Sequence, residues 1–345
     1  MTVGHPLHRW LTRLAEPGCD PVTGGEAGFI SRHRLEPLAF ALGGNVPEWE
    51  MAYAHTLAMG ASHLREAGRL AGMLESAGVD AVWTRGVFHG VRWYGDFARR
   101  PFTDLDVVFA PDQSGKAFEV LREAGYGLRG KGFPAWYFRR YHLHWPMRQE
   151  GSGMLLDAHW AVDHAGSKLR AKMDEVMAEA EWQDAEGIRW REPSVRHQMV
   201  LACLHLAKEC DGYWGRENVD PVLQGDAPGR FLSWLDAGLM MGAIDGEAGW
   251  EEVWEVADAW RCREVVETVI AKLRGVAAGG GAVEDREERG DMDQGFLGWL
   301  GQAAGFRPRR LAGIEWGPRS VWFAVEAGCA TGLVMMMNWI RGARV

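Results

Sequence analysis

Cysteine is scarce in this 345-residue chain, and no two cysteines have the spacing of a metal or redox motif. The five cysteines are odd in number, widely scattered and include no Cys-x-x-Cys pair. This usage excludes a disulfide-stapled scaffold and a zinc knuckle, and it predicts reduced thiols in the cytoplasm. The N-terminal stretch also lacks the apolar core of a signal peptide, which again predicts a cytoplasmic protein.

Positive charge is in short supply as well. Thirty-eight Lys and Arg stand against 47 Asp and Glu, which gives a formal net charge of −9. A protein that binds along a nucleic-acid backbone needs a basic stripe, so we expect no nucleic-acid partner. One stretch, 321–340, is mostly apolar, but Glu326 and Asn338 interrupt it. We therefore expect a buried or partner-facing helix there and no membrane span.

Helical and strand patterns alternate in the middle of the chain. Apolar residues recur at three- and four-residue steps between 48 and 77, which predicts a long helix. The elements predicted after it are a strand at 79–84, a helix at 87–94, a strand at 103–109, a helix at 116–124, and strands around 141–145 and 154–160. This interleaving predicts a compact α/β or α+β unit.

The flanking regions have weaker patterns. We predict a helix near 7–14 followed by loops, and almost no strands after about residue 165. Helical faces recur at 199–207 and without a break from 250 to 273, whereas 277–293 has the composition of a connector. The chain is thus divided into three parts: an N-terminal segment 1–49, a core 50–165, and a mostly helical region 166–345 that forms the other wall of a cleft.

The strongest chemical signal is a pair of aspartates on one strand. Side chains alternate along a strand, so Asp104 and Asp106 share one face while their apolar neighbours share the other. A second strand repeats the pattern with Asp157 and His159. An edge strand facing solvent would explain Asp-x-Asp alone. Three carboxylates on two strands, however, suffice to hold divalent cations for phosphoryl or nucleotidyl transfer.

Basic and glycine residues lie close to this strand in the sequence. Arg85 and Gly86 occupy a predicted strand-to-helix junction, where backbone N–H groups can bind a phosphate. A glycine that simply turns the chain is the alternative. Arg99 and Arg100 precede the aspartate strand and are candidates for binding a triphosphate, unless they belong to a solvated loop.

These motifs together resemble the nucleotidyltransferase superfamily that includes polymerase β, and within it the uncharacterised nucleotidyltransferases. The matching pieces are Arg85-Gly86, Arg100-Pro101-Phe102-Thr103-Asp104-Leu105-Asp106, Gly125-Tyr126 and Asp157-Ala158-His159-Trp160. The resemblance covers roughly residues 50–165 well, and the helical remainder more loosely through Leu235-Asp236 and Trp250-Glu251.

The resemblance implies a polymerase β-like core, a small mixed sheet with helices on one side. It implies a metal-dependent nucleotidyltransferase in which Asp104, Asp106 and Asp157 hold Mg²⁺ or Mn²⁺ and the phosphates of an NTP donor lie near Gly86. The expected acceptor is a hydroxyl of a small molecule, sugar or peptide. One departure matters: the family's usual Gly-Ser after the first strand is replaced by Arg85-Gly86-Val87, which offers no hydroxyl to the phosphate.

Histidines open further interpretations. His142 and His144 are expected on one face of a strand, where they would contact phosphate or orient an aspartate. With Asp157, His159 and His164 they would instead form a transition-metal site of the kind that cupin-like dioxygenases use. The spacing of His197 and His205 on a predicted helix allows both to face a cleft, and a polar stretch at 208–216 would cover a substrate. A transferase with a sugar-nucleotide donor and a binding protein without turnover are also compatible with the aspartate motifs.

Overall fold

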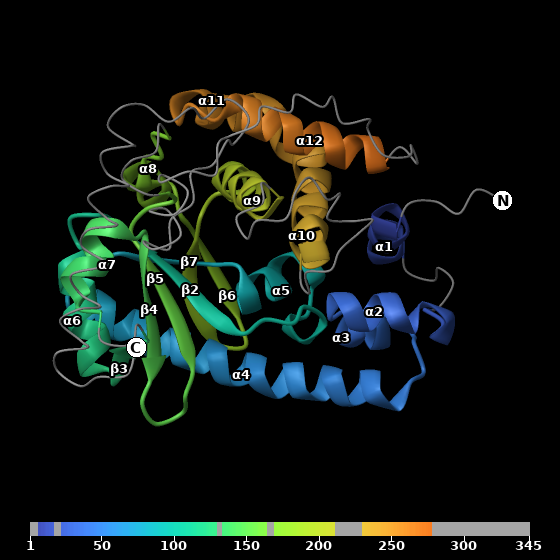
Figure 1. Cartoon of the computed structure of the whole chain (residues 1–345), viewed down its shortest axis with the longest axis horizontal. Coiled ribbons are helices and arrows are strands. Elements are labelled where there is room, and N and C mark those ends of the chain that lie inside the picture. The colour runs from blue at the N-terminus through green and yellow to red at the C-terminus, as the bar shows by residue number, and fades with distance from the viewer. Residues whose placement is uncertain (1–5, 17–21, 130–132, 164–168, 211–229, 278–345) are drawn as a thin grey trace, which may run out of the picture.

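The computed structural model of the protein describes residues 6–16, 22–129, 133–163, 169–210 and 230–277 (Figure 1). Within these ranges a mixed sheet lies at the centre, with helices on both sides of it. The helices that flank it are the long α4 (Pro47–Ser76) below, and α8 (Met173–Ala178), α9 (Val195–Cys210), α11 (Trp250–Ala259) and α12 (Arg263–Ala277) above, in the view of Figure 1.

The central sheet has five strands in the order β1-β2-β5-β4-β3. Strands β2 and β5 run parallel, and every other neighbouring pair runs antiparallel. The strands are β1 (Ala81–Thr84), β2 (Asp104–Phe109), β3 (Tyr126–Leu128), β4 (His144–Gln149) and β5 (Leu155–His159). The predicted α+β fold with a small mixed sheet is therefore confirmed.

The two faces of the sheet are buried differently. Leu105, Val107 and Phe109 alternate along β2 and pack in one apolar cluster with residues of α4 and of α6 (Ser114–Glu123). On the opposite face, Val82 and Val108 belong to the cluster built mainly by the helices after residue 169. The polar residues of β2 and β5 lie on this second face, so the helical region covers the sheet beside them. The expectation of helices on one side only was wrong.

Two of the predicted helices have a regular sequence basis. Helix α4 buries Leu64, Ala67, Leu70 and Leu74, whose spacing of three and four residues places them on one stripe. Helix α5 (Gly86–Tyr94) follows β1 directly and ends at Gly95, whose φ of 68° suits glycine. The helix predicted near residues 7–14 is also present, as α1 (Pro6–Ala15).

The N-terminal loops predicted after that helix were wrong. Residues 24–41 form short helices. The periodicity of apolar residues did not reveal them, because none is longer than about two turns. They are η1 (Gly24–Glu26), α2 (Ala27–His33) and α3 (Glu36–Ala41). Ile30, Leu35 and Leu38 are fully buried, so tertiary packing stabilises these short elements.

The strand predicted at 141–145 was placed too early in the chain, and the helix that precedes it was not predicted. Residues 135–141 form α7 (Ala135–Tyr141), which buries Tyr137, Phe138 and Tyr141. His142 is the residue that ends this helix, and β4 begins only at His144. His142 and His144 therefore do not alternate on one strand. The short β3 was also missed.

Strands after residue 165 were predicted to be almost absent, yet a hairpin follows α8. Strands β6 (Glu181–Ala185) and β7 (Ile188–Glu192) pair antiparallel around Glu186 and Gly187. Both turn residues have positive φ, 53° and 72°, which is the geometry of a two-residue hairpin turn. Glu-Gly is a weaker sequence signal for this turn than Asn-Gly or Asp-Gly.

The helical region also differs in detail from its prediction. The continuous helix expected from 250 to 273 is broken into α11 and α12, because Arg261 adopts a left-handed backbone with φ of 59°. Helix α10 (Arg230–Ala243) was not predicted, and a short helical turn, η3 (Ile244–Ala248), continues it.

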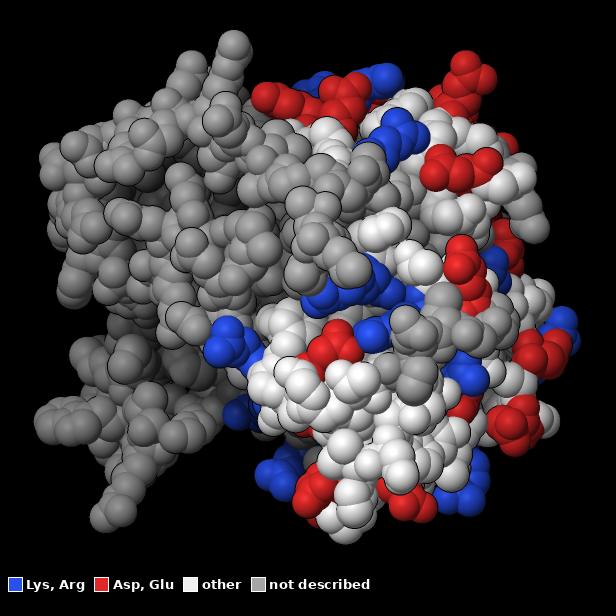
Figure 2. Space-filling model, turned by 90° about the vertical axis from the view of Figure 1, so that its right-hand side faces the viewer, with Lys and Arg blue, Asp and Glu red and all other residues white. Residues whose placement is uncertain are grey.

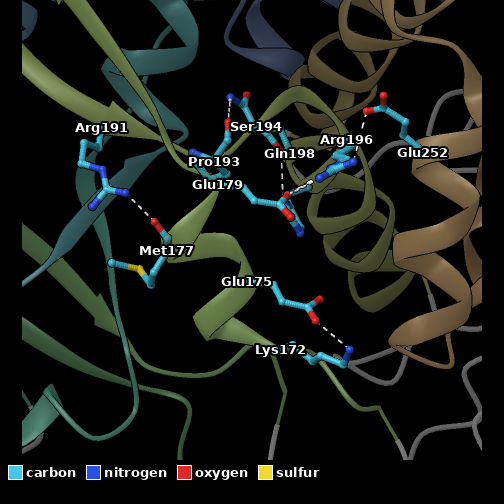
Figure 3. A network of polar contacts seen from close by, with 11 residues as sticks. Lys172, Glu175, Met177, Glu179, Arg191, Pro193, Ser194, Arg196, Gln198 and Glu252 are labelled. Carbon is cyan, nitrogen blue, oxygen red and sulfur yellow. Dashed lines mark hydrogen bonds and ion pairs between the residues drawn. The ribbon is translucent and has the colours of Figure 1, made fainter.

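A network of polar contacts joins α8, the hairpin, α9 and α11 (Figure 3). Arg196 of α9 binds the Glu179 carboxylate at 2.5 Å and the Glu252 carboxylate at 3.3 Å. Arg191 of β7 donates a hydrogen bond to the carbonyl of Met177. These contacts attach the hairpin to the helical region, although their partly exposed ion pairs contribute little stability individually.

No helix among the described residues is long and apolar enough to cross a membrane. The apolar stretch 321–340, the connector 277–293 and the polar residues 211–216 lie outside the described residues.

Two helical glycines offer a test of the packing. A Cβ atom on Gly90 would lie 2.7 Å from Phe97 Cα, whereas one on Gly72 would meet nothing within 4 Å. We expect Gly90→Ala to lower the free energy of unfolding by roughly 1–3 kcal/mol, because backbone must move. The control Gly72→Ala should raise it by roughly 0.5–1 kcal/mol. Urea unfolding of both variants measures this, and equal effects would contradict the packing of Phe97 on α5.

Candidate active site

The sheet register brings the predicted aspartates together. Asp106 of β2 pairs directly with Asp157 of the parallel strand β5, so both carboxylates leave the sheet on the same face. Thr84 of β1 pairs with Asp106 on its other side. Asp104 lies two residues before Asp106 on the same face of β2, at the strand's first position. The sequence-predicted trio is thus assembled by the pairing of two strands.

Two histidines complete this face. His159 Nε2 lies 3.1 Å from Asp106 Oδ1, and His144 Nε2 lies 3.7 Å from Asp157 Oδ2. The register places His144 opposite His159, and their ring centroids are 4.7 Å apart. The four side chains are 11–24% exposed, so each is mostly buried but still in contact with water.

Burial and mutual repulsion separate the pKa values of the three carboxyls. Burial and the Asp106 charge raise the pKa of Asp104 to about 6. Burial and the charges of Asp106 and Asp104 raise the pKa of Asp157 to about 7. Burial also opposes the charge on Asp106, but Arg85 and the hydrogen bond with His159 hold the pKa of that carboxyl well below its usual range. Asp106 is therefore the fixed anion of the group.

The donor set fits a divalent cation. One ligand atom from each of Asp106, Asp157 and His159 lies within 4.8 Å of the others. Asp157 Oδ1 is buried and accepts no hydrogen bond from the described residues. A buried acceptor without a donor is costly, and a cation at this position would satisfy it. Asp104 is not part of this compact set, although its charge adds to burial and the Asp106 charge in raising the pKa of Asp157.

The loop between β1 and α5 presents cationic and backbone groups to the trio. Arg85 opposes the rise that burial causes in the pKa values of Asp104 and Asp157, and it helps to lower the pKa of Asp106, so its charge lies near all three carboxyls. Arg85 has φ of 57° and Gly86 has φ of 49°, so two successive residues adopt conformations that are strained for any residue but glycine. A Cβ on Gly86 would lie 3.2 Å from the carbonyl oxygen of Asp104. Glycine lets this loop approach the aspartate strand closely.

Arg100, a predicted triphosphate ligand, has its donors occupied by the protein. Its Nε and Nη2 bind the two Asp236 carboxylate oxygens at 2.9 and 2.6 Å, and its Nη1 lies 3.4 Å from the Gly86 carbonyl oxygen. The residue is 8% exposed. Arg99, the other arginine of this motif, donates a hydrogen bond to the Tyr94 carbonyl at 3.0 Å.

The remaining histidines separate into two groups. Burial raises the pKa of Asp106, and His205 of α9 acts with Arg85 and His159 to lower it, so His205 lies near this carboxylate. His197 of the same helix is buried against the Trp260 ring and Ser194 instead. The expectation that both face one cleft was therefore wrong for His197. His142 packs beside Tyr137 and Phe138.

The sequence reasoning missed Arg129, which follows β3. Burial and the neighbouring aspartates raise the pKa of Asp157, and Arg129 is the largest influence opposing that rise. Its backbone N–H donates to the Pro146 carbonyl at 2.8 Å, which places it at the end of the β3–β4 pair. No local motif marks this residue. His164 and the side chains from Lys208 to Arg216 lie outside the described residues.

The raised pKa of Asp157 predicts a pH-dependent stability. The carboxyl titrates near its ordinary pKa of 3.8 when unfolded and near 7 when folded, so its contribution is full below pH 4 and is lost as the pH rises to 7. In a chelator, wild type should lose roughly 2 kcal/mol relative to Asp157→Asn between about pH 4 and pH 8, since water screens part of the shift. Urea unfolding across this pH range measures the difference. The exposed Asp112→Asn is the control, and parallel curves for wild type and Asp157→Asn would contradict the assignment.

Comparisons with known proteins bear on identity. Three solved structures share 13–14% identity with the chain. A solution structure of the antibiotic-resistance factor ANT(2″)-Ia matches with 61% of this chain and 97% of that chain covered and a TM-score of 0.36. A crystal structure of ANT(2″)-Ia with adenylyl-2″-tobramycin covers 59% and 99% with a TM-score of 0.35. An antigenic nucleotidyltransferase-like protein from Paracoccidioides brasiliensis covers 60% and 91% with a TM-score of 0.30.

These structural likenesses are too distant to support an argument about this chain, and the comparison with curated proteins gave no match. The family of this chain is shown instead by a match to the sequence profile of one family. The family described as uncharacterised nucleotidyltransferase matches residues 30–274, which is more than two thirds of the chain and includes every aspartate and histidine of the site. The resemblance inferred from the motifs is confirmed: the protein belongs to the uncharacterised nucleotidyltransferase family and is a transferase enzyme.

Proposed function

We propose that the protein transfers a nucleoside monophosphate from an NTP to a hydroxyl group of a small molecule, sugar or peptide. The observation that carries this proposal is the direct pairing of Asp106 with Asp157, with Asp104 beside them on β2. The charge of Arg85 lies near all three carboxyls. Anionic oxygens concentrated on one sheet face require cations, and metal-bound phosphates satisfy that requirement.

Asp104, Asp106 and Asp157 hold the divalent cation in this proposal, with His159 as a further ligand. A bound Mg²⁺ or Mn²⁺ supplies Lewis-acid charge that stabilises the transferred phosphorus and the leaving pyrophosphate. The unsatisfied oxygen of Asp157 supports this assignment. His159 Nε2 lies 3.1 Å from Asp106 Oδ1, and this contact fixes the orientation of the Asp106 carboxylate.

Asp157 has the properties of a general base for the acceptor. Burial and the charges of Asp106 and Asp104 raise the pKa of Asp157 to about 7 when no cation is bound, and a cation on the same carboxylate would lower that pKa. In this proposal the oxygen of Asp157 that does not bind the cation is the base, because it lies beside the acceptor hydroxyl. The acceptor hydroxyl gives its proton to Asp157 as its oxygen bonds to the α-phosphorus. The bond from that phosphorus to the bridging oxygen breaks, and pyrophosphate leaves with the electron pair. No oxidant or further co-reactant is needed.

The loop at Arg85 and Gly86 is assigned to the donor phosphates. It begins the nine-residue helix α5, whose N-terminal N–H groups favour an anion. Val87 stands where the family usually has a serine, so the hydroxyl that would contact the phosphate is absent. Arg85 supplies a positive charge for the phosphate at this loop instead. A charge-assisted bond from Arg85 compensates for the lost hydroxyl contact.

The acceptor is assigned to a small molecule, sugar or peptide on electrostatic grounds. On the described part of the face in Figure 2, acidic side chains flank the basic ones, and no unbroken basic stripe crosses it. A polynucleotide acceptor would require such a stripe. The described helices after residue 169 are assigned to the second wall of a cleft over the core 50–165, because they pack against the sheet face that carries the aspartates. The free, buried Cys203 and Cys262 and the NTP donor favour a cytoplasmic protein.

A second candidate follows from the histidine in the ligand set. Asp106, Asp157 and His159 together resemble the mixed oxygen and nitrogen donors that transition metals use. A His/Asp enzyme of this kind would contain stoichiometric Zn or Fe after purification, which elemental analysis measures. The nucleotidyltransferase assignment uses the same residues with Mg²⁺ or Mn²⁺ and also accounts for Asp104 and Arg85.

Donor binding gives a direct prediction. Isothermal titration of the four NTPs with Mg²⁺ should show metal-dependent binding by wild type, weakened at least roughly 100-fold in Asp104→Asn/Asp106→Asn because the metal loses two anionic ligands. The exposed pair Asp112→Asn/Asp184→Asn removes the same charge elsewhere and should bind as wild type does. Absence of binding by folded wild type would remove the NTP-dependent function. Binding of a sugar nucleotide instead would favour the related transferase.

Turnover gives a separate prediction. Wild type should release pyrophosphate from an NTP when offered the correct member of a panel of sugars, aminoglycosides and hydroxyl-bearing peptides. Asp157→Asn should keep the fold and reduce kcat by roughly 10²–10⁴, because the base is lost. Metal-dependent NTP binding without pyrophosphate release from any acceptor, in a folded protein, would favour a binding protein without turnover.

A further inference from the structure

A buried polar cluster lies beside the active site and connects distant parts of the chain. Asp236 of α10 accepts hydrogen bonds from Tyr94 at 2.8 Å and from Arg100 at 2.9 and 2.6 Å, and His89 Nδ1 lies 3.3 Å from it. Asp236 is 4% exposed and Arg100 is 8% exposed. Residues separated by 136 positions in sequence are thus joined by a two-point ion pair.

Arg100 also connects this cluster to the Arg85–Gly86 loop, here called the donor loop, through its Nη1 nitrogen. Arg100 Nη1 lies 3.4 Å from the Gly86 carbonyl oxygen and 3.3 Å from the Pro101 carbonyl oxygen. Gly86 belongs to the strained loop that faces the aspartates, and Pro101 leads into β2 with Asp104 and Asp106. One guanidinium therefore contacts both segments that carry the active site, while Asp236 fixes the guanidinium from the helical region.

Stability alone is a poor explanation for this arrangement. A buried ion pair costs about as much in desolvation as it returns, and apolar residues of similar volume often serve stability equally well. The planar fork of Arg100 does what an apolar side chain would not: it fixes two backbone carbonyls relative to one carboxylate. The backbone at Arg85 is strained, so the Arg85–Gly86 loop needs neighbours that hold it in place.

We propose that Arg100 and Asp236 are positioning residues of the donor site: the ion pair holds the Arg85–Gly86 loop against the aspartate strand and ties its geometry to the helical wall at α10. Arg100 acts through the Gly86 carbonyl and does not touch the nucleotide. This inference rests on the proposed function for its effect on donor binding, but not for its effect on the loop itself. Tyr94 and His89 orient the Asp236 carboxylate.

The test uses the full-length protein and replaces the pair with apolar residues. Arg100→Met/Asp236→Leu removes both charges together, so that neither is left buried alone. Arg100→Lys keeps the charge but loses the fork, and it serves if the double variant does not fold. The control Arg196→Met/Glu179→Leu removes a 2.5 Å Arg–Glu pair in the network of Figure 3, and neither residue belongs to the Arg100–Asp236 cluster or to the aspartate face.

Two readouts separate the effect on the loop from the effect on the donor site. Amide hydrogen exchange by mass spectrometry, without nucleotide, should show faster exchange in peptides covering residues 84–92 of the test variants, but not in the control. Titration with ATP and Mg²⁺ should show the dissociation constant raised by roughly tenfold or more, because the phosphate-binding loop is misplaced. Arg100→Lys should show both effects in the same direction.

The outcomes are distinct. Unchanged exchange at 84–92 in folded Arg100→Lys or in the folded double variant would overturn the proposal. Faster exchange with unchanged ATP affinity would overturn the positioning of the donor site and leave a purely structural pair. If folded wild type binds no NTP, the proposed function fails, and the exchange experiment still decides whether Arg100 and Asp236 hold the loop.

Discussion

Electrostatic repulsion among three carboxylates is the constraint on which the site depends. Asp104, Asp106 and Asp157 lie on one face of β2 and β5, where the strand pairing leaves them no room to separate. Only Asp106 keeps a firmly ionised state, because Arg85 and His159 offset the effect of burial on its pKa. The other two have pKa values near 6 and 7 and are poised to accept cations or protons. The metal-dependent transfer that we propose needs carboxylates in this state.

The apolar side of the same strands explains why the repulsion is tolerated. Leu105, Val107 and Phe109 are buried against α4 and α6, so β2 is anchored by its other face. Burial of such side chains contributes roughly 1.5–3 kcal/mol each, which offsets the cost of holding charged groups close together. Function is thus concentrated on a strand whose position is fixed by packing. The paired Asp236 and Arg100 likewise contact the Arg85–Gly86 loop, through the Gly86 carbonyl.

Several of the elements that carry the site could be predicted from the sequence, because they depend on local patterns. The long helix α4, the strand with Asp104 and Asp106, and the strand with Asp157 follow from periodicities of 3.6 and 2 residues. The elements missed were short or held by distant contacts. Helices α2 and α3 are too short to show a period. Helix α7 was missed, and the strand expected at 141–145 begins only at His144, because Tyr137, Phe138 and Tyr141 are buried in that helix. The β6–β7 hairpin depends on two positive φ angles that Glu-Gly signals weakly.

The sequence by itself determined which residues carry charge on one face of each strand, and its motifs determined the family. It did not determine which strand lies beside which. The parallel pairing of Asp106 with Asp157, the approach of His159 and Arg129, and the capture of Arg100 by Asp236 were decided only by the tertiary structure. The reason is physical: side-chain alternation is a property of a few consecutive residues, whereas strand order and buried polar contacts depend on packing between segments up to 147 residues apart.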